Sequence, residues 1–259
     1  MVSIVLRFHQ ATCQLLAMSP VVDEAARAVI DNRERRLGVS IPAAVAEWYG
    51  LRGAVDVLAG ANGDHPRSAA RLGEPSGNWG GAPRDLVPEG LLVVCTENQA
   101  VCHWAVPLDE GPDPQVLVER GDSGQEPVWQ HHAPSFSDYV FALAWDRVAF
   151  ALPYGLAAQD VPLRTEDVGR LERGFVQRQR TYAWPANTSY RFERPEQRVV
   201  IWDGDRQADW WLLAATEQAL ASLARQLWGC GQLATSLYGC GHNGQRAEEV
   251  VARLRAVSG

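Results

Sequence analysis

The chain contains no lysine, so arginine alone supplies its 24 basic side chains other than histidine. Against them stand 31 acidic residues, which give the 259 residues a formal net charge of −7. A general nucleic-acid-binding protein needs a broad basic face, and this balance argues against one. Alanine, glycine and valine are also frequent, so a bias toward arginine codons explains the missing lysine more simply than selection for arginine chemistry.

Cysteine is scarce and long apolar runs are absent. The five cysteines are too few and too scattered for a disulfide scaffold, and an odd number suits a reducing compartment. The sequence contains no run of about 18 apolar residues, so we expect no membrane span. Residues 1–17 are fairly apolar, but Arg7 and His9 interrupt them, so we expect no signal peptide; a start at Met18 is an alternative. These features predict a cytoplasmic protein that binds neither nucleic acid nor membrane.

The negative charge lies in the first part of the chain. Residues 1–150 carry 19 acids and 11 arginines, whereas residues 151–259 carry 12 acids and 13 arginines. Within the first part, residues 84–126 hold nine acids and two arginines. A solvated acidic surface is the plain interpretation. The functional one is a face for a basic protein, because such a potential steers encounters.

Helix and strand patterns follow one another through residues 19–150. Apolar residues at helical spacing predict a helix over 21–37 with Ser19 as its N-cap. Residues 62–90 predict a long loop, and short strands are expected near 55–58, just before it. The remaining expected elements are a short helix ending at Tyr49, strands at 91–95, 101–108, 115–119 and 127–131, and a helix over 136–150 capped by Ser135. Sequential strands joined by short turns favour a mostly antiparallel sheet flanked by helices, an α+β domain.

Residues 151–259 predict a second, smaller α+β part, either packed on the first or forming a separate subdomain. Pro153, Gly155 and Pro162 make residues 151–162 a linker candidate. The expected elements are helices at 164–174, 216–228 and 245–257, and strands at 191–192, 199–202, 208–214 and 233–237.

Several short motifs stand in a particular order in the first part. They are Glu34-x-x-Leu37-Gly38, Ile41-Pro42, Glu47-Trp48-Tyr49, a hairpin over 92–106 with Glu97-Asn98-Gln99 at its turn, Asp113-Pro114-Gln115-Val116, Pro127-Val128-Trp129, and Ser135-Phe136-Ser137-Asp138-Tyr139-Val140. With this order and spacing, residues 19–150 resemble the SUKH superfamily, which includes fungal cell-wall-synthesis regulators of the Smi/Knr type. The family often has an Asn-Gly pair soon after the Tyr helix, whereas here Asn62-Gly63 stands later. Residues 151–259 lie outside the resemblance.

The resemblance implies a non-catalytic protein-binding domain, and we expect no cofactor. Many bacterial members look like immunity proteins that neutralise toxins, often nucleases, while fungal members act as regulatory scaffolds. We therefore expect a toxin-immunity protein that blocks a basic toxin domain by occlusion, with a regulatory or scaffold protein as the alternative. An aromatic anchor would support the acidic face. The expected steering charges are Asp109, Glu110, Asp113, Glu119 and Asp122.

A small enzyme or metal-binding protein is the third interpretation. Cys230, Cys240 and His242 come nearest to a zinc set, but a fourth ligand is missing. Cys102 and His103 are adjacent in an expected strand and point to opposite faces, so they cannot form a thiolate–imidazole pair directly. We therefore expect neither a catalytic residue nor a metal site.

Adjacent aromatic side chains also divide between two faces. His131 and His132 diverge in an extended chain, and Trp210 and Trp211 must face opposite sides of their strand. One tryptophan is therefore buried, and the other lies at an interface or is exposed. Five arginines stand nearby in sequence, and we expect their side of the second part to dock on the acidic segment: Arg178, Arg180, Arg191, Arg194 and Arg198.

Overall fold

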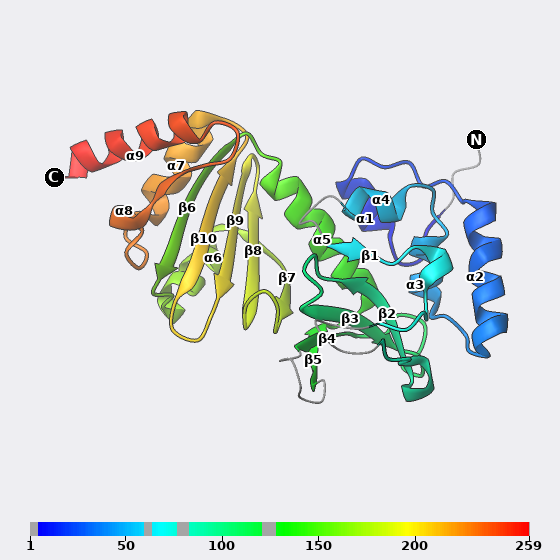
Figure 1. The fold of residues 1–259 in the computed structure, drawn as a ribbon. Coiled ribbons are helices and arrows are strands. Elements are labelled where there is room, and N and C mark those ends of the chain that lie inside the picture. The colour runs from blue at the N-terminus through cyan, green and yellow to red at the C-terminus, as the bar shows by residue number, and fades with distance from the viewer. Residues whose placement is uncertain (1–4, 60–63, 77–82, 121–127, 259) are drawn as a thin grey trace. The chain divides into compact units, whose positions relative to one another are not determined.

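Two antiparallel sheets, each with its own helices, make up the structure (Figure 1). The computed structural model describes residues 5–59, 64–76, 83–120 and 128–258. The chain divides into a first unit that ends at Arg147 and a second unit that begins at Val148. The α+β class predicted from the sequence is therefore confirmed. In the described residues, no helix has both the length and the apolar character needed to span a membrane.

The sheet of the first unit has the strand order β1-β2-β3-β4-β5. Its strands are β1 (His65–Pro66), β2 (Leu91–Thr96), β3 (Cys102–Pro107), β4 (Val116–Arg120) and β5 (Val128–Ala133). The predicted hairpin of β2 and β3 is confirmed, with Leu92 opposite Val106 and Thr96 opposite His103. The next two predicted strands, β4 and β5, also pair antiparallel with the strand before them in the chain.

The helices of this unit are α1 (Gln10–Leu15), α2 (Glu24–Leu37), α3 (Ala43–Tyr49), α4 (Ala54–Ala59) and α5 (Phe136–Phe150), with 3₁₀ turns η1 (Ala69–Arg71) and η2 (Val87–Glu89). Two predictions are wrong. Helix α2 begins after Asp23 rather than Ser19, because the Asp23 carboxylate accepts the amides of Ala25 and Ala26. Residues 55–58 are helical rather than extended, since the amide of Val57 bonds to the carbonyl of Gly53 at 3.1 Å.

Aromatic side chains join helix α5 to the sheet. Phe136 and Tyr139 lie on α5, and Tyr139 packs against Trp104 of β3 at 6.3 Å between ring centroids. From α3, the hydroxyl of Tyr49 donates to the carbonyl of Val94 at 2.8 Å. The predicted Ser135 cap is confirmed, because its hydroxyl accepts the amide of Asp138 at 3.0 Å. The side of the sheet that faces α5 is therefore its inner face.

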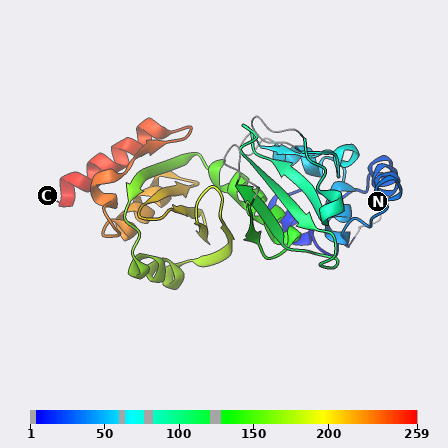
Figure 2. The ribbon, with the colours of Figure 1, turned by 60° about the horizontal axis from the view of Figure 1, so that its bottom comes forward.

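The sheet of the second unit has the order β11-β6-β10-β9-β8-β7. Its strands are β6 (Tyr154–Val161), β7 (Val176–Tyr182), β8 (Thr188–Arg194), β9 (Gln197–Asp203), β10 (Ala208–Ala214) and β11 (Tyr238–Cys240). Its helices are α6 (Thr165–Gly174), α7 (Glu217–Leu227), α8 (Leu233–Ser236) and α9 (Gly244–Ser258). Figure 2 gives a second view of both sheets, with α9 ending at the C-terminus.

Three expectations for this unit are wrong or incomplete. The linker candidate at 151–162 contains β6, which pairs with β10 on one side and β11 on the other. Residues 233–236 form helix α8 rather than a strand. Strand β7 was not expected, because its sequence of charged and polar residues lacks an apolar alternation.

One face of this second sheet carries a closed apolar core. Leu156, Ile201 and Trp210 are fully buried there and pack with Leu220 and Leu223 of α7. Residues of α6, α8 and α9 join the same cluster, so all four helices cover this face. Large buried aliphatic and aromatic areas of this kind supply the main stabilisation of the unit.

Candidate functional site

The predicted steering acids occupy different environments. Asp109 and Glu110 are exposed in the turn between β3 and β4. Asp113 is half-buried, and its carboxylate accepts the amide of Ser137 at 3.0 Å and the Ser137 hydroxyl at 2.6 Å. It therefore ties the turn to the first turn of α5, a structural task.

Glu119 is only 6% exposed on β4, directly opposite His103 of β3 and Trp129 of β5. With so little exposed area, this carboxylate presents almost no surface to an approaching protein. Asp122 lies outside the described residues. Of the five predicted acids, Asp109 and Glu110 are thus the ones that the structure places on an exposed turn.

Hydrogen bonds connect this acidic turn to the edge strand. The side-chain amide of Gln115 donates to Oε1 of Glu110 at 2.8 Å, and its Oε1 lies 2.9 Å from Nδ1 of His131. His131 is exposed on β5 and stands opposite Leu117. The turn and the exposed part of β5 therefore form one continuous surface.

The side of the first sheet turned away from α5, its outer face, is apolar at its centre. Leu86, Val93 and Ala105 are buried there, with Leu91 and Trp129 packed against them. Side chains alternate along strands, so Leu117, Trp129 and His131 all lie on this face. We call Asp109, Glu110, Leu117, Trp129 and His131 the acidic–aromatic surface.

His131 and His132 diverge, as predicted. His132 is 4% exposed and packs against Trp104 and Tyr139 on the inner face. His131 instead belongs to the acidic–aromatic surface. A shared metal or paired acid–base role for these neighbours has no geometric basis.

Polar side chains also meet at His103 of β3, two of them from residues 62–90, which the sequence predicted to be a loop. Nη2 of Arg67 donates to the hydroxyl of Ser76 at 2.6 Å. The Ser76 hydroxyl lies 3.2 Å from Nδ1 of His103, and the Thr96 hydroxyl lies 3.1 Å from the same nitrogen. Sequence reasoning missed Arg67 and Ser76, because only the folded path of residues 64–76 brings them to the strands.

The cysteines are poorly suited to nucleophilic chemistry. Cys102 is buried, and its neighbour His103 faces the other side of the strand, as predicted. Burial raises the pKa of Cys95 to about 12 and that of Cys230 to about 11. Thiols with such pKa values remain protonated at neutral pH, whereas the thiolate is the reactive form.

The zinc candidates do not form a cluster. Cys230 is fully buried in the core beneath α7, whereas Cys240 lies on β11 beside Gly155. His242 is exposed. Throughout the described residues, no three His, Cys, Asp or Glu side chains are grouped so that they could hold a metal ion.

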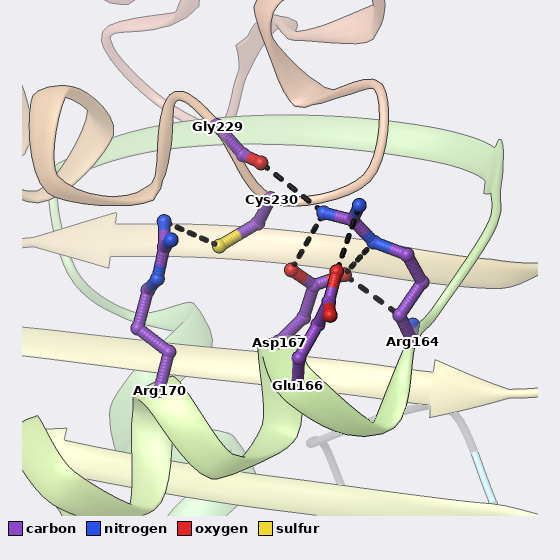
Figure 3. A network of polar contacts seen from close by, with 6 residues as sticks. All are labelled: Arg164, Glu166, Asp167, Arg170, Gly229 and Cys230. Atoms are coloured by element: carbon purple, nitrogen blue, oxygen red, sulfur yellow. Dashed lines mark hydrogen bonds and ion pairs between the residues drawn. The ribbon is translucent and has the colours of Figure 1, made fainter.

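A polar network in the second unit has a structural role (Figure 3). The carboxylate of Asp167 is 2% exposed and accepts from Nε and Nη2 of Arg164 at 3.0 and 3.1 Å. Arg164 also donates to the carbonyl of Gly229 at 3.3 Å, and Nη1 of Arg170 lies 3.7 Å from Sγ of Cys230. The network fastens α6 to the segment after α7.

The predicted arginine-rich side is paired within its own unit. Arg178 and Arg198 both form ion pairs with Glu193, and Arg180 pairs with Glu172 at 3.0 Å. Arg191 donates to the hydroxyl of Thr181 at 3.1 Å, and Arg194 donates to Oε1 of Gln226 at 2.6 Å. These charges do not need the acidic segment as a partner, and docking of the two surfaces stays a prediction.

The prediction that Trp210 and Trp211 face opposite sides of β10, with one of them buried, is confirmed. Trp210 is fully buried in the core, whereas Trp211 lies half-buried on the opposite face against Trp202 and Phe150.

No family model, curated protein or solved structure matches the chain.

Proposed function

We propose that this chain is a non-catalytic binding protein that covers a basic partner protein with its acidic–aromatic surface. The observation that carries the proposal is that the acidic turn and the exposed part of β5 form one continuous surface. The exposed carboxylate of Glu110, beside exposed Asp109 in the same turn, accepts from Gln115, which in turn contacts His131; His131 lies on the same face of β5 as the half-buried ring of Trp129, two residues away. Carboxylates at the rim and an aromatic side chain near the centre are the arrangement that protein interfaces favour.

The most specific form of the proposal is toxin immunity, as the SUKH resemblance of residues 19–150 implies. The carboxylates would accelerate encounter with a basic catalytic domain, and the outer face would then exclude its substrate by occlusion. A regulatory scaffold is the alternative, and it would use the same surface without inactivating an enzyme.

The test begins with a partner captured from the source cell on the immobilised full-length chain and identified by mass spectrometry. Expression of that partner in a surrogate bacterium should arrest growth, and co-expression of this chain should restore it. Trp129→Ala should weaken binding at least about tenfold, as the loss of an aromatic anchor does. Tyr238→Ala, which truncates an exposed aromatic side chain of the second unit, is the control and should bind normally.

The outcomes separate the candidates. A harmless partner whose binding depends on Trp129 supports the scaffold. A toxic partner bound equally well by the Trp129 variant rejects the acidic–aromatic surface. Circular dichroism of each variant establishes that a loss of binding does not come from unfolding.

A further inference from the structure

A fully buried histidine lies at the start of α1 in the first unit. The ring of His9 is packed between two aromatic side chains, 5.1 Å from the ring of Trp48 on α3 and 5.8 Å from the ring of Phe136 on α5, measured between centroids. None of these residues belongs to the acidic–aromatic surface. The proposed partner binding therefore does not explain why a titratable ring is placed among them.

Only one nitrogen of this ring is hydrogen-bonded. Nε2 of His9 lies 2.8 Å from the carbonyl oxygen of Ala44, and because a carbonyl can only accept, Nε2 carries the proton and donates it. Nδ1 is buried and has no hydrogen-bond partner among the described residues. A neutral ring keeps a lone pair at that nitrogen. A protonated ring would place there a charged donor that faces no acceptor, which is a much larger cost in a buried site.

Two carboxylates act on the ring, but both are engaged elsewhere. Glu47 of α3 accepts the backbone amides of residues 7–9. Asp113, in the β3–β4 turn, accepts the amide and the hydroxyl of Ser137. The other titratable groups on the elements around the ring are Arg7, Cys13, Tyr49, Asp138 and Tyr139. None of these groups forms a hydrogen bond with the ring of His9.

Burial and the carboxylates act on the pKa of His9 in opposite directions. Burial is the largest influence and lowers this pKa below its ordinary value of 6.5, whereas the Ala44 carbonyl, Glu47 and Asp113 raise it by smaller amounts. The net effect is a lower pKa, so the ring binds a proton less tightly when it is packed against Trp48 and Phe136 than when it is in water.

We propose that His9 is an acid-sensitive latch: residues 5–15 pack on the first unit while the ring is neutral, and they are released when it is protonated. Because the released ring binds the proton more tightly, packing of the segment is complete above pH 6.5 and is lost as the pH falls below that value. Release would uncover Trp48, Phe136 and the thiol of Cys13, which is 1% exposed on α1.

The thiol of Cys13 offers a direct test on the full-length chain. Dithiodipyridine reacts with accessible thiols at acidic as well as neutral pH, and peptide mass spectrometry identifies the modified residue. Rates at pH 5 and pH 7 are divided by those of the urea-denatured chain at the same pH. We expect the corrected rate of Cys13 to rise about tenfold or more at pH 5, because only the released segment exposes it. Cys102 of β3 should stay unreactive at both pH values, since the sheet remains folded.

Variants assign the response to the ring. His9→Gln keeps a side-chain amide that can donate to Ala44 but cannot gain a proton, so Cys13 should be equally protected at pH 5 and pH 7. His242→Gln, which removes an exposed histidine of the second unit, is the control and should respond as the wild-type chain does. If His9→Gln already exposes Cys13 at pH 7, NMR of the wild-type chain decides. The His9 ring signals should then titrate at the pH where Cys13 becomes reactive, and separate midpoints would reject the latch.

Three other results overturn the proposal. They are equal corrected rates of Cys13 at pH 5 and pH 7 in the wild-type chain, an acid response that persists unchanged in His9→Gln, and exposure of Cys102 together with Cys13, which would indicate that the whole unit unfolds. These experiments need no partner protein, so the latch and the acidic–aromatic surface are tested separately.

Discussion

Glu47 of α3 holds the N-terminal segment onto the first unit, and its removal should release that segment. Oε1 of Glu47 accepts the amides of Phe8 and His9 at 2.9 and 3.0 Å, and Oε2 accepts the amide of Arg7 at 2.8 Å. Arg7 and Phe8 precede α1 and His9 is its N-cap, so one carboxylate accepts three consecutive amides at the start of the helix. The same contacts seat the ring of His9, which is fully buried and lies 2.8 Å from the carbonyl of Ala44.

The expected loss is graded by the number of bonds removed. A hydrogen bond to a charged group contributes about 1.5–3 kcal/mol to stability. Because the released amides can bond to water instead, we expect Glu47→Ala to lower the free energy of unfolding by about 2–4 kcal/mol in all. Glu47→Gln keeps one carbonyl oxygen, which can still accept two amides, and should cost about 1 kcal/mol. For a unit of this size the Ala variant should lower Tm by about 5–10 °C.

Hydrogen exchange followed by mass spectrometry is the decisive assay, because it reads the amides themselves. Protection of residues 7–9 should fall in Glu47→Ala and fall less in Glu47→Gln. Asp31→Asn changes an exposed carboxylate in the middle of α2 and should leave both protection and Tm unchanged. Unaltered protection at residues 7–9 in Glu47→Ala would refute the reasoning.

Three further predictions concern packing, pH and thiols. Trp210→Ala should cost about 3–5 kcal/mol in urea unfolding because it empties a closed core, while Trp211→Ala, on the half-buried side, should cost less than half as much; equal losses would contradict the assigned faces. The pKa of Asp64 is about 6 in the folded state against an ordinary value of 3.8, so the folded chain holds this proton more tightly. The extra stability that the folded chain gains from this proton is present below pH 4 and is lost as the pH rises toward 6. Asp64→Asn should remove this part of the pH dependence of stability, measured as urea unfolding midpoints between pH 4 and 7. Cysteine alkylation at pH 8 should be slow in the native chain, with half-buried Cys240 modified first in peptide mass spectra, because the other four thiols are buried; fast modification of Cys95 would contradict its placement.

Local sequence signals were sufficient where elements are regular and amphipathic. The β2–β3 hairpin, α5 and α7 were predictable from alternation and helical spacing, and α5 also from its cap at Ser135. Strand β6 was not, because Pro153, Gly155 and Pro162 suggested a linker. The prolines actually flank the strand, and Gly155 inside it leaves room for Cys240, whose Sγ would lie 2.9 Å from an added Cβ.

The acidic–aromatic surface was only partly predictable for a similar reason. Residue type identified the acids and the need for an aromatic anchor, but exposure depends on what covers each strand. Glu119 lies on the same face as Trp129, yet it is only 6% exposed. Asp113 is drawn into contact with Ser137, 24 residues away. Arg67 likewise donates to Ser76, whose hydroxyl lies against His103, and no local pattern predicts these contacts.

The most direct test of the binding role is the salt dependence of association with the captured partner, measured by stopped flow. Asp109→Lys/Glu110→Lys should lower the association rate about tenfold or more at low salt and flatten its dependence on ionic strength, because steering acts through these exposed charges. The control Asp31→Lys/Glu249→Lys makes the same change in net charge at exposed positions elsewhere. Equal association rates and equal salt slopes for the wild-type chain and both variants would contradict the account.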